Sequence, residues 1–351
     1  MMKQGLSLQE MAVELDRQRQ AKRDFIVDTR AMEFGLDQDD GIVLNVKEID
    51  APPMRLRPVA HQQFASVNGI PKVYYDRMLG DAPDLLATNL NHWLRNQPAQ
   101  RMLRTIDGEA RALLSDRYRP LDNYDLAQTV LPKLTELEAE VKSCAITEDR
   151  FYIKAVSPRI EGEVKQGDLI QAGIVVSNSE VGLGALRLEE LDFRLVCLNG
   201  MIRAQAVRKA HLGRGVEHDA IEQAREFFRT ETRELEDRAF WCQVQDATAA
   251  MFNPQRFRQR LLEYQEAAQQ PCSNDPIKAV EVVSRHLELN ETEGRNVLAH
   301  LIQGGDLSRW GLANAVTRAA EDSENYTRAT ELEAAGGRVI ELPKSEWEKM
   351  N

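Results

Sequence analysis

Four basic residues between Val196 and Gly215 have the clearest chemical potential in this sequence. They are Arg203, Arg208, Lys209 and Arg214, and no aspartate or glutamate lies among them, although the whole chain has a net charge of −11. Arginine and lysine bind phosphate, and the nearby Asn199-Gly200 can bring backbone amides close to an anion. This acid-free segment therefore predicts a phosphate-binding surface.

A second group with binding potential consists of Arg117, Tyr118 and Arg119. Proteins commonly hold single-stranded nucleic acid with arginines on the phosphates and an aromatic ring stacked on a base. If both groups line one groove of a sheet, they predict a channel that follows a nucleic-acid strand.

The alternative is a structural role for the same side chains. Tyr118 would then pack inside the protein, and arginines on the strands would form ion pairs with acids on neighbouring strands. The residues that this alternative pairs are Arg187, Arg194 and Arg203 with Glu189, Glu190 and Asp192.

A third group consists of amides and hydroxyls in turn-prone positions, namely Ser177, Asn178, Ser179, Asn199 and Asn314. Buried polar groups must find hydrogen-bond partners, and asparagine is well suited to turns. The pattern favours a role in bracing turns over contacts with a sugar or a base edge.

Enzyme signatures are missing from the sequence. It contains no glycine-rich phosphate loop ending in Gly-Lys-Ser/Thr, no His-Glu-x-x-His and no Gly-x-Ser-x-Gly. No two of the four cysteines form a Cys-x-x-Cys pair for zinc or redox chemistry. We therefore expect no catalytic residue, no metal and no cofactor. The enzymatic alternative is a nuclease-like carboxylate cluster assembled from Asp107, Glu109, Asp116 and Asp122.

The composition is that of a globular chain, with 42% hydrophobic and 29% charged residues. The net charge excludes a uniformly basic coat but allows a local basic groove. We find no apolar signal-peptide core and no apolar run near the ~20 residues of a membrane span. We expect a cytoplasmic protein with reduced cysteines and no membrane partner.

The elements that would position these groups form an α+β fold. Strand-like runs flank Asp107-Gly108, which is a strong hairpin signal, and further strands are expected at 151–156, 170–176 and 185–197. We expect one mostly antiparallel sheet with flanking helices on one face. The predicted parts are a flexible or helical arm over residues 1–30, the sheet domain over 31–215 and a helical C-terminal subdomain over 216–351.

Helix signals are concentrated in the last third of the chain. Asp275-Pro276 predicts a helix start, and Asn290 with Glu293 predicts a capping box. Gly304-Gly305 predicts a helix end, whereas Gly336-Gly337 predicts a turn into a short final strand.

Three separated motifs resemble a known family. They are Arg117–Asn123, then Ser177–Gly182 with Arg194–Met201, and finally Trp310–Arg318 with Leu332–Gly337. Together they resemble the phage/plasmid-like family catalogued as Domain of Unknown Function 932. The resemblance implies an accessory protein of a mobile genetic element and gives no reaction.

These observations predict a phage, prophage or plasmid protein that binds single-stranded nucleic acid and anneals strands. Its expected partners are single-stranded DNA and further copies of itself, because annealing needs a ring or filament that holds one strand by its phosphates. The first alternative is a non-enzymatic protein that binds a host protein and inhibits a host defence or nuclease, since an acidic surface can imitate DNA. The second is a metal-dependent enzyme that acts on nucleic acid.

Overall fold

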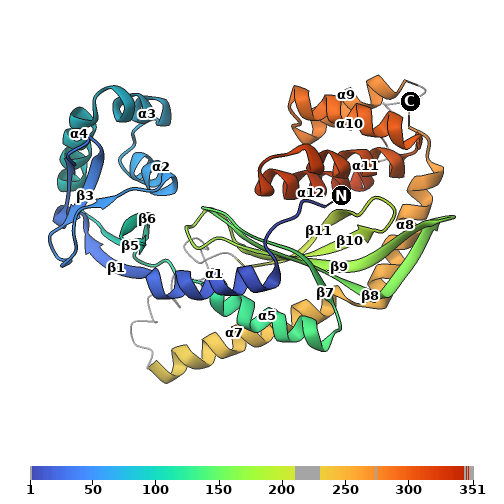
Figure 1. Cartoon of the computed structure of the whole chain (residues 1–351), viewed down its shortest axis with the longest axis horizontal. Helices are drawn as coiled ribbons and strands as arrows, with labels where there is room; N and C mark the ends of the chain where they lie inside the picture. The colour runs from blue at the N-terminus through green and yellow to red at the C-terminus, as the bar shows by residue number, and fades with distance from the viewer. Residues whose placement is uncertain (1, 210–229, 273–274, 344, 346, 348–351) are drawn as a thin grey trace.

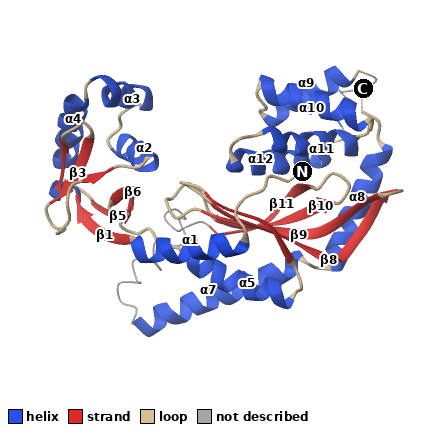
Figure 2. Ribbon diagram, in the orientation of Figure 1, coloured by secondary structure: helices blue, strands red, loops and turns tan. Residues whose placement is uncertain are grey.

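The structure is a computed structural model that describes residues 2–209, 230–272, 275–343, 345 and 347, with only the backbone considered at 204–209 and 230–234. Antiparallel strands and numerous helices give the predicted α+β fold (Figures 1 and 2). The described residues form three sheets, so the expectation of a single sheet is wrong.

The N-terminal lobe, residues 23–115, contains two three-stranded sheets, ordered β1-β5-β6 and β2-β3-β4. Its strands are β1 (Arg23–Asp28), β2 (Met32–Leu36), β3 (Ile42–Val46), β4 (Met54–Arg55), β5 (Gln100–Ile106) and β6 (Glu109–Ser115). Its helices are the 3-10 helix η1 (Thr29–Ala31), α2 (Pro58–Val67), α3 (Lys72–Asp81) and α4 (Pro83–Asn96). Asp107 and Gly108 join β5 to β6 with positive φ angles of 54° and 78°, which confirms the predicted hairpin.

The central sheet has five strands in the order β11-β10-β9-β8-β7, all antiparallel. They are β7 (Glu140–Ile146), β8 (Phe151–Lys165), β9 (Asp168–Asn178), β10 (Leu186–Arg194) and β11 (Asn199–Lys209). One face packs on α1 (Leu8–Ala21), α5 (Asn123–Glu136) and α7 (Thr230–Met251), and the other packs on α12 (Tyr326–Glu341) (Figure 1).

Helices therefore cover both faces of the central sheet, not one face as expected. The reason is visible in β9, where Ile174-Val175-Val176 are consecutive apolar residues and all three are fully buried. A strand that is buried on both faces has such a continuous apolar run instead of an alternating pattern.

The C-terminal helices are α8 (Pro254–Gln269), α9 (Pro276–Leu287), α10 (Glu291–Gly304), α11 (Arg309–Arg318), the 3-10 helix η3 (Ala319–Asp322) and α12 (Tyr326–Glu341). The Asp275 side chain caps α9 by accepting hydrogen bonds from two backbone amides. Asn290 and Glu293 form the predicted capping box, and Gly305 ends α10 in the left-handed conformation. These three helix signals are confirmed.

The predicted turn at Gly336-Gly337 is wrong, because both glycines lie inside α12. A Cβ atom at Gly336 would overlap the Thr317 side chain of α11, and one at Gly337 would overlap the Ile202 carbonyl of β11. Here glycine permits close packing of a helix against its neighbours.

Candidate functional site

Arg203, the first residue of the predicted phosphate-binding surface, is buried in the structure. Only 7% of Arg203 is exposed. Its Nη2 lies 2.8 Å from a Glu263 carboxylate oxygen of α8, and its Nε lies 3.1 Å from Glu341 of α12. Two carboxylates from the same chain therefore neutralise this guanidinium and hold α8 and α12 against β11.

Three further residues of the predicted groove also have partners within the protein. Arg119 forms an ion pair with Asp237 of α7. Tyr118 is buried and donates its hydroxyl to the Ser179 carbonyl at 3.2 Å. The buried Asn199 amide donates to the Thr317 hydroxyl of α11. These side chains position structural elements, as the structural alternative requires for Tyr118.

The remaining predicted residues lie elsewhere. Arg117 is exposed, in the turn that follows β6. Arg208 and Lys209 are the last two residues of β11. Arg214 lies outside the described residues. The described structure thus does not bring the predicted residues together in a single groove.

The ion pairs expected by the structural alternative are replaced by other pairs. Arg194 binds Asp168 in place of an acid on its own strand, with Nε 2.5 Å from a carboxylate oxygen. Glu190 and Asp192 instead bind Arg260 of α8. Glu190 and Asp192 therefore hold a helix to the sheet, whereas Arg194 and Asp168 pair across β10 and β9.

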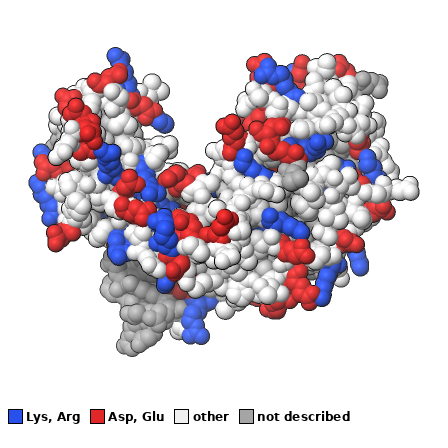
Figure 3. Space-filling model, viewed as in Figure 1, with Lys and Arg blue, Asp and Glu red and all other residues white. Residues whose placement is uncertain are grey.

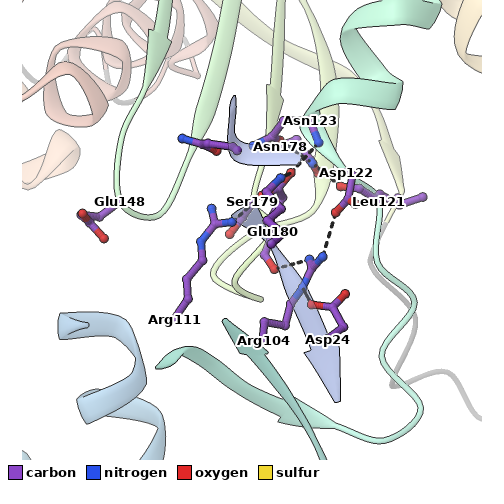
Figure 4. A network of polar contacts seen from close by, with 12 residues as sticks. Asp24, Arg104, Arg111, Leu121, Asp122, Asn123, Glu148, Asn178, Ser179 and Glu180 are labelled. Atoms are coloured by element: carbon purple, nitrogen blue, oxygen red, sulfur yellow. Dashed lines mark hydrogen bonds and ion pairs between the residues drawn. The ribbon is translucent and has the colours of Figure 1, made fainter. Parts of the chain in front are cut away.

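The Ser177–Gly182 motif is organised around Glu180, which sequence reasoning did not single out. Glu180 is 1% exposed. One carboxylate oxygen lies 2.6 Å from Arg111 Nη1 of β6, and the other lies 2.5 Å from Lys22 Nζ and accepts a hydrogen bond from the Asn123 amide at 2.6 Å. The network around Glu180 is drawn in Figure 4.

Neighbouring side chains extend this Glu180 network. The Asn178 amide donates to the Leu121 carbonyl at 2.7 Å, which confirms the predicted bracing role. Arg104 of β5 donates to the Glu180 carbonyl and forms ion pairs with Asp24 and Asp122, each at 2.8 Å. The network therefore connects the N-terminal lobe to the end of β9.

The charge environment of Glu180 fixes its protonation. Burial by itself would raise the pKa of Glu180, but Lys22 and Arg111 outweigh that effect and lower the pKa to about 2. Glu180 is therefore ionised at neutral pH, and its charge is matched by cations from two other elements.

A cavity of about 400 Å³ lies next to this network, between α1, the β5–β6 hairpin and the turn from β7 to β8. Its lining residues are Leu6, Glu14, Arg17, Gln18, Arg57, Ile106, Arg111, Ile146, Thr147 and Glu148. Arg111 contacts the cavity and Glu180 at once, so the cavity and the network share a wall.

A row of four residues crosses the central sheet near its N-terminal-lobe end. Tyr152 of β8 is opposite Ser177 of β9, Ser177 is opposite Arg187 of β10, and Arg187 is opposite Arg208 of β11. The Tyr152 ring contacts Tyr326 of α12, so the row belongs to the face that carries the C-terminal helices. We call this set the cleft row. Its Tyr152 and Ser177 side chains are buried.

The cleft row has further charged neighbours. Lys209 follows Arg208 in β11. Burial raises the pKa of Glu189, and the positive charges of Arg187 and Arg150 act against this. The Arg187 Nε atom is buried and has no hydrogen-bond partner among the described residues.

Two further properties concern the described part of the chain. None of its helices is both long enough and apolar enough to cross a membrane. It also contains no group of three or more His, Cys, Asp or Glu side chains arranged to hold a metal ion. Three acids of the nuclease-like alternative, Asp107, Glu109 and Asp122, are in ion pairs with arginines.

Comparison with known proteins identifies the family. A family model described as a domain of unknown function (DUF932) matches residues 111–338, from β6 to α12, and so covers more than half of the chain. Searches of curated proteins and of solved structures returned no match. The chain therefore belongs to the DUF932 family, as the three sequence motifs predicted.

Proposed function

We propose that this protein binds single-stranded nucleic acid along the cleft row, as an accessory protein of a mobile genetic element. The observation that carries the proposal is the direct opposition of Arg187 and Arg208 in the β10–β11 register. Like charges at opposed positions of a sheet destabilise it, and an anion bound there would offset that cost.

The neighbouring residues support an anionic partner. Arg150 adds positive charge at the same end of the sheet, and both Arg150 and Arg187 act on the Glu189 carboxylate. Phosphate groups of an extended strand would bind such a row through their charge, without a requirement for sequence.

The proposal keeps part of the predicted site and replaces the rest. Arg208 stays as a phosphate contact, and Arg187 and Arg150 join it. Arg203, Arg119, Tyr118 and Asn199 hold the elements that carry the row, and we assign them no contact with the ligand.

The direct test is the fluorescence anisotropy of a labelled single-stranded oligonucleotide titrated with the full-length protein. We expect binding at low salt that weakens steeply as salt rises, because phosphate contacts release counterions. A duplex of the same sequence should bind more weakly. The absence of binding at low salt would overturn the proposal, and equal affinity for the duplex would overturn its single-strand part.

A further inference from the structure

We propose that a cavity between α10, α11 and the turn from β10 to β11 binds a small α-amino acid. The cavity has a volume of about 170 Å³, which is below the roughly 300–1,000 Å³ of sites for drug-sized ligands. Its wall includes Val196, which is 61% exposed, so the cavity opens to solvent. The inference goes beyond strand binding, because the ligand carries no part of a nucleic acid.

One face of α11 forms much of the cavity wall. Its lining residues are Gly311, Asn314, Ala315 and Arg318. Residues three or four positions apart lie on the same side of a helix, with Cβ atoms about 5–6 Å from each other. Asn314 and Arg318 are therefore neighbouring groups that one small ligand can contact together.

Two of the three sequence motifs meet at this cavity. Asn314 and Arg318 belong to the last motif, whereas Arg194 and Cys197 belong to the middle one. The fold thus brings polar residues from two distant segments into one wall.

The first argument is a hydrogen-bond acceptor that is open to the cavity. Asn314 is 4% exposed, and its Nδ2 donates to the Trp310 carbonyl at 2.8 Å, which fixes the orientation of the amide. The opposite atom, Oδ1, has no hydrogen-bond partner among the described residues and keeps accessible surface in the cavity wall. An N–H group of a ligand would satisfy this acceptor.

The second argument is a guanidinium without a carboxylate partner. Arg318 donates from Nη2 to an uncharged amide oxygen of α10 at 3.3 Å and forms no ion pair with a described residue. The other lysine and arginine of the wall are compensated. Lys165 lies 2.6 Å from Asp306. Arg194 lies 2.5 Å from Asp168. Arg318 is therefore the cation that a ligand carboxylate would bind, with two parallel hydrogen bonds to the guanidinium.

The third argument is an acid in the same wall. Burial by itself would raise the pKa of Asp306, but hydrogen bonds from Lys165 and Ser308 outweigh that effect and lower the pKa. Asp306 is therefore ionised at neutral pH. A ligand that has an ammonium group next to its carboxylate would match the charges of this wall, with the ammonium group near Asn314 Oδ1 and Asp306.

The test compares L-alanine with two compounds that each lack one of its groups. Propionate lacks the amino group, and ethylamine lacks the carboxylate. Isothermal titration of the full-length protein should detect L-alanine, with both analogues at least fivefold weaker. Equal binding of either analogue, or no binding of L-alanine, would overturn the proposal.

Two variants locate the site. Arg318→Gln removes the uncompensated charge and should weaken L-alanine binding at least tenfold. Arg285→Gln, at a side chain that is 78% exposed on α9, is the matched control and should bind like the wild type. Equal affinity of the two variants would show that the amino acid binds elsewhere and would overturn the assignment.

A further measurement requires no variant and uses two cysteines of the chain as reporters. Cys197 lines the cavity and is half-buried, whereas Cys242 is exposed on α7. L-alanine should slow the alkylation of Cys197 by iodoacetamide at least threefold and leave the rate at Cys242 unchanged, as measured by peptide mass spectrometry. An unchanged rate at Cys197, or equal slowing at both thiols, would contradict binding in this cavity.

Discussion

Glu180 is the buried charge around which the N-terminal lobe and the central sheet are joined. Its partners come from separate elements: Lys22 follows α1, Arg111 belongs to β6, and the Asn123 amide begins α5. A charge in such a position is tolerated only because its partners are close, and removal of the charge leaves those cations without compensation.

Replacement of Glu180 by Gln should therefore destabilise the fold by about 3–5 kcal/mol. The measurement is the free energy of unfolding from urea denaturation at pH 7. Glu281→Gln, whose side chain is 62% exposed and lies 3.8 Å from Arg285, should change stability by less than about 1 kcal/mol. Equal stability of the Glu180 and Glu281 variants would contradict the structural role of the network.

The same carboxylate predicts a pH dependence. The pKa of Glu180 in the folded protein is about 2, below its ordinary value of 4.5. Its contribution should be complete above about pH 4.5 and should decline as the pH falls toward 2. The stability difference between wild type and Glu180→Gln should thus be constant from pH 7 to 5 and become smaller below 4.5. A difference that does not change down to pH 3 would argue against this account.

Sequence reasoning correctly identified the Ser177–Gly182 motif as unusual, but it could not find the role of Glu180. The partners Arg111 and Lys22 are 69 and 158 residues away, and only the tertiary fold brings them together. The same limit applies to Arg203, whose partner Glu263 is 60 residues away on a helix. A local absence of acids does not show that a basic residue lacks a partner.

At the scale of elements, α12 packs on the face of the central sheet that lies opposite α1, α5 and α7. Lys154 of β8 and Glu333 of α12 form a fully buried ion pair at 2.5 Å, and Lys154 also lies 4.8 Å from the centre of the Tyr326 ring. Further along, Gly337 brings the helix close to the Ile202 carbonyl of β11.

Substitution of Gly337 by Ala should destabilise the protein by about 1–3 kcal/mol, because the added methyl group would overlap β11. That loss should exceed the ~1 kcal/mol that alanine gains over glycine within a helix. The measurement is the midpoint of thermal or urea unfolding. Gly304→Ala, at the end of α10 with no atom within 4 Å of the added Cβ, should be neutral or slightly stabilising. A stable Gly337 variant would show that α12 can move away from the sheet.

Elements with a local signal were predictable, and elements set by packing were not. The Asp107-Gly108 hairpin, the Asp275 cap and the Asn290 capping box each depend on residues close in sequence, and all three are present. Gly336-Gly337 has the composition of a turn, but the neighbours that require glycine are Thr317 and Ile202, which are distant in sequence. Composition could not distinguish these two uses of glycine.

At the scale of the whole molecule, the N-terminal lobe and the C-terminal helices stand on either side of a hollow above the end of the central sheet (Figure 3). The single sheet expected from the sequence is three sheets, because the hairpin strands pair with β1 and because β2, β3 and β4 pair with one another. Strand order depends on contacts between distant segments. The hydropathy pattern therefore predicts where strands lie in the sequence but not which strands pair.

Phosphate binding at the cleft row is the central claim about this molecule. The decisive measurement compares two double variants with equal loss of charge, Arg187→Gln with Arg208→Gln, and Arg77→Gln with Arg285→Gln. The second pair consists of side chains that are 77% and 78% exposed on α3 and α9.

Single-stranded DNA affinity should be measured over a range of salt concentrations for the wild type and both variants. We expect the cleft-row variant to bind at least tenfold more weakly at low salt, with a slope of log K against log salt that is smaller by about 1–2. The control variant should match the wild type. If both variants bind as the wild type does, or lose affinity equally, the cleft row is not the phosphate site.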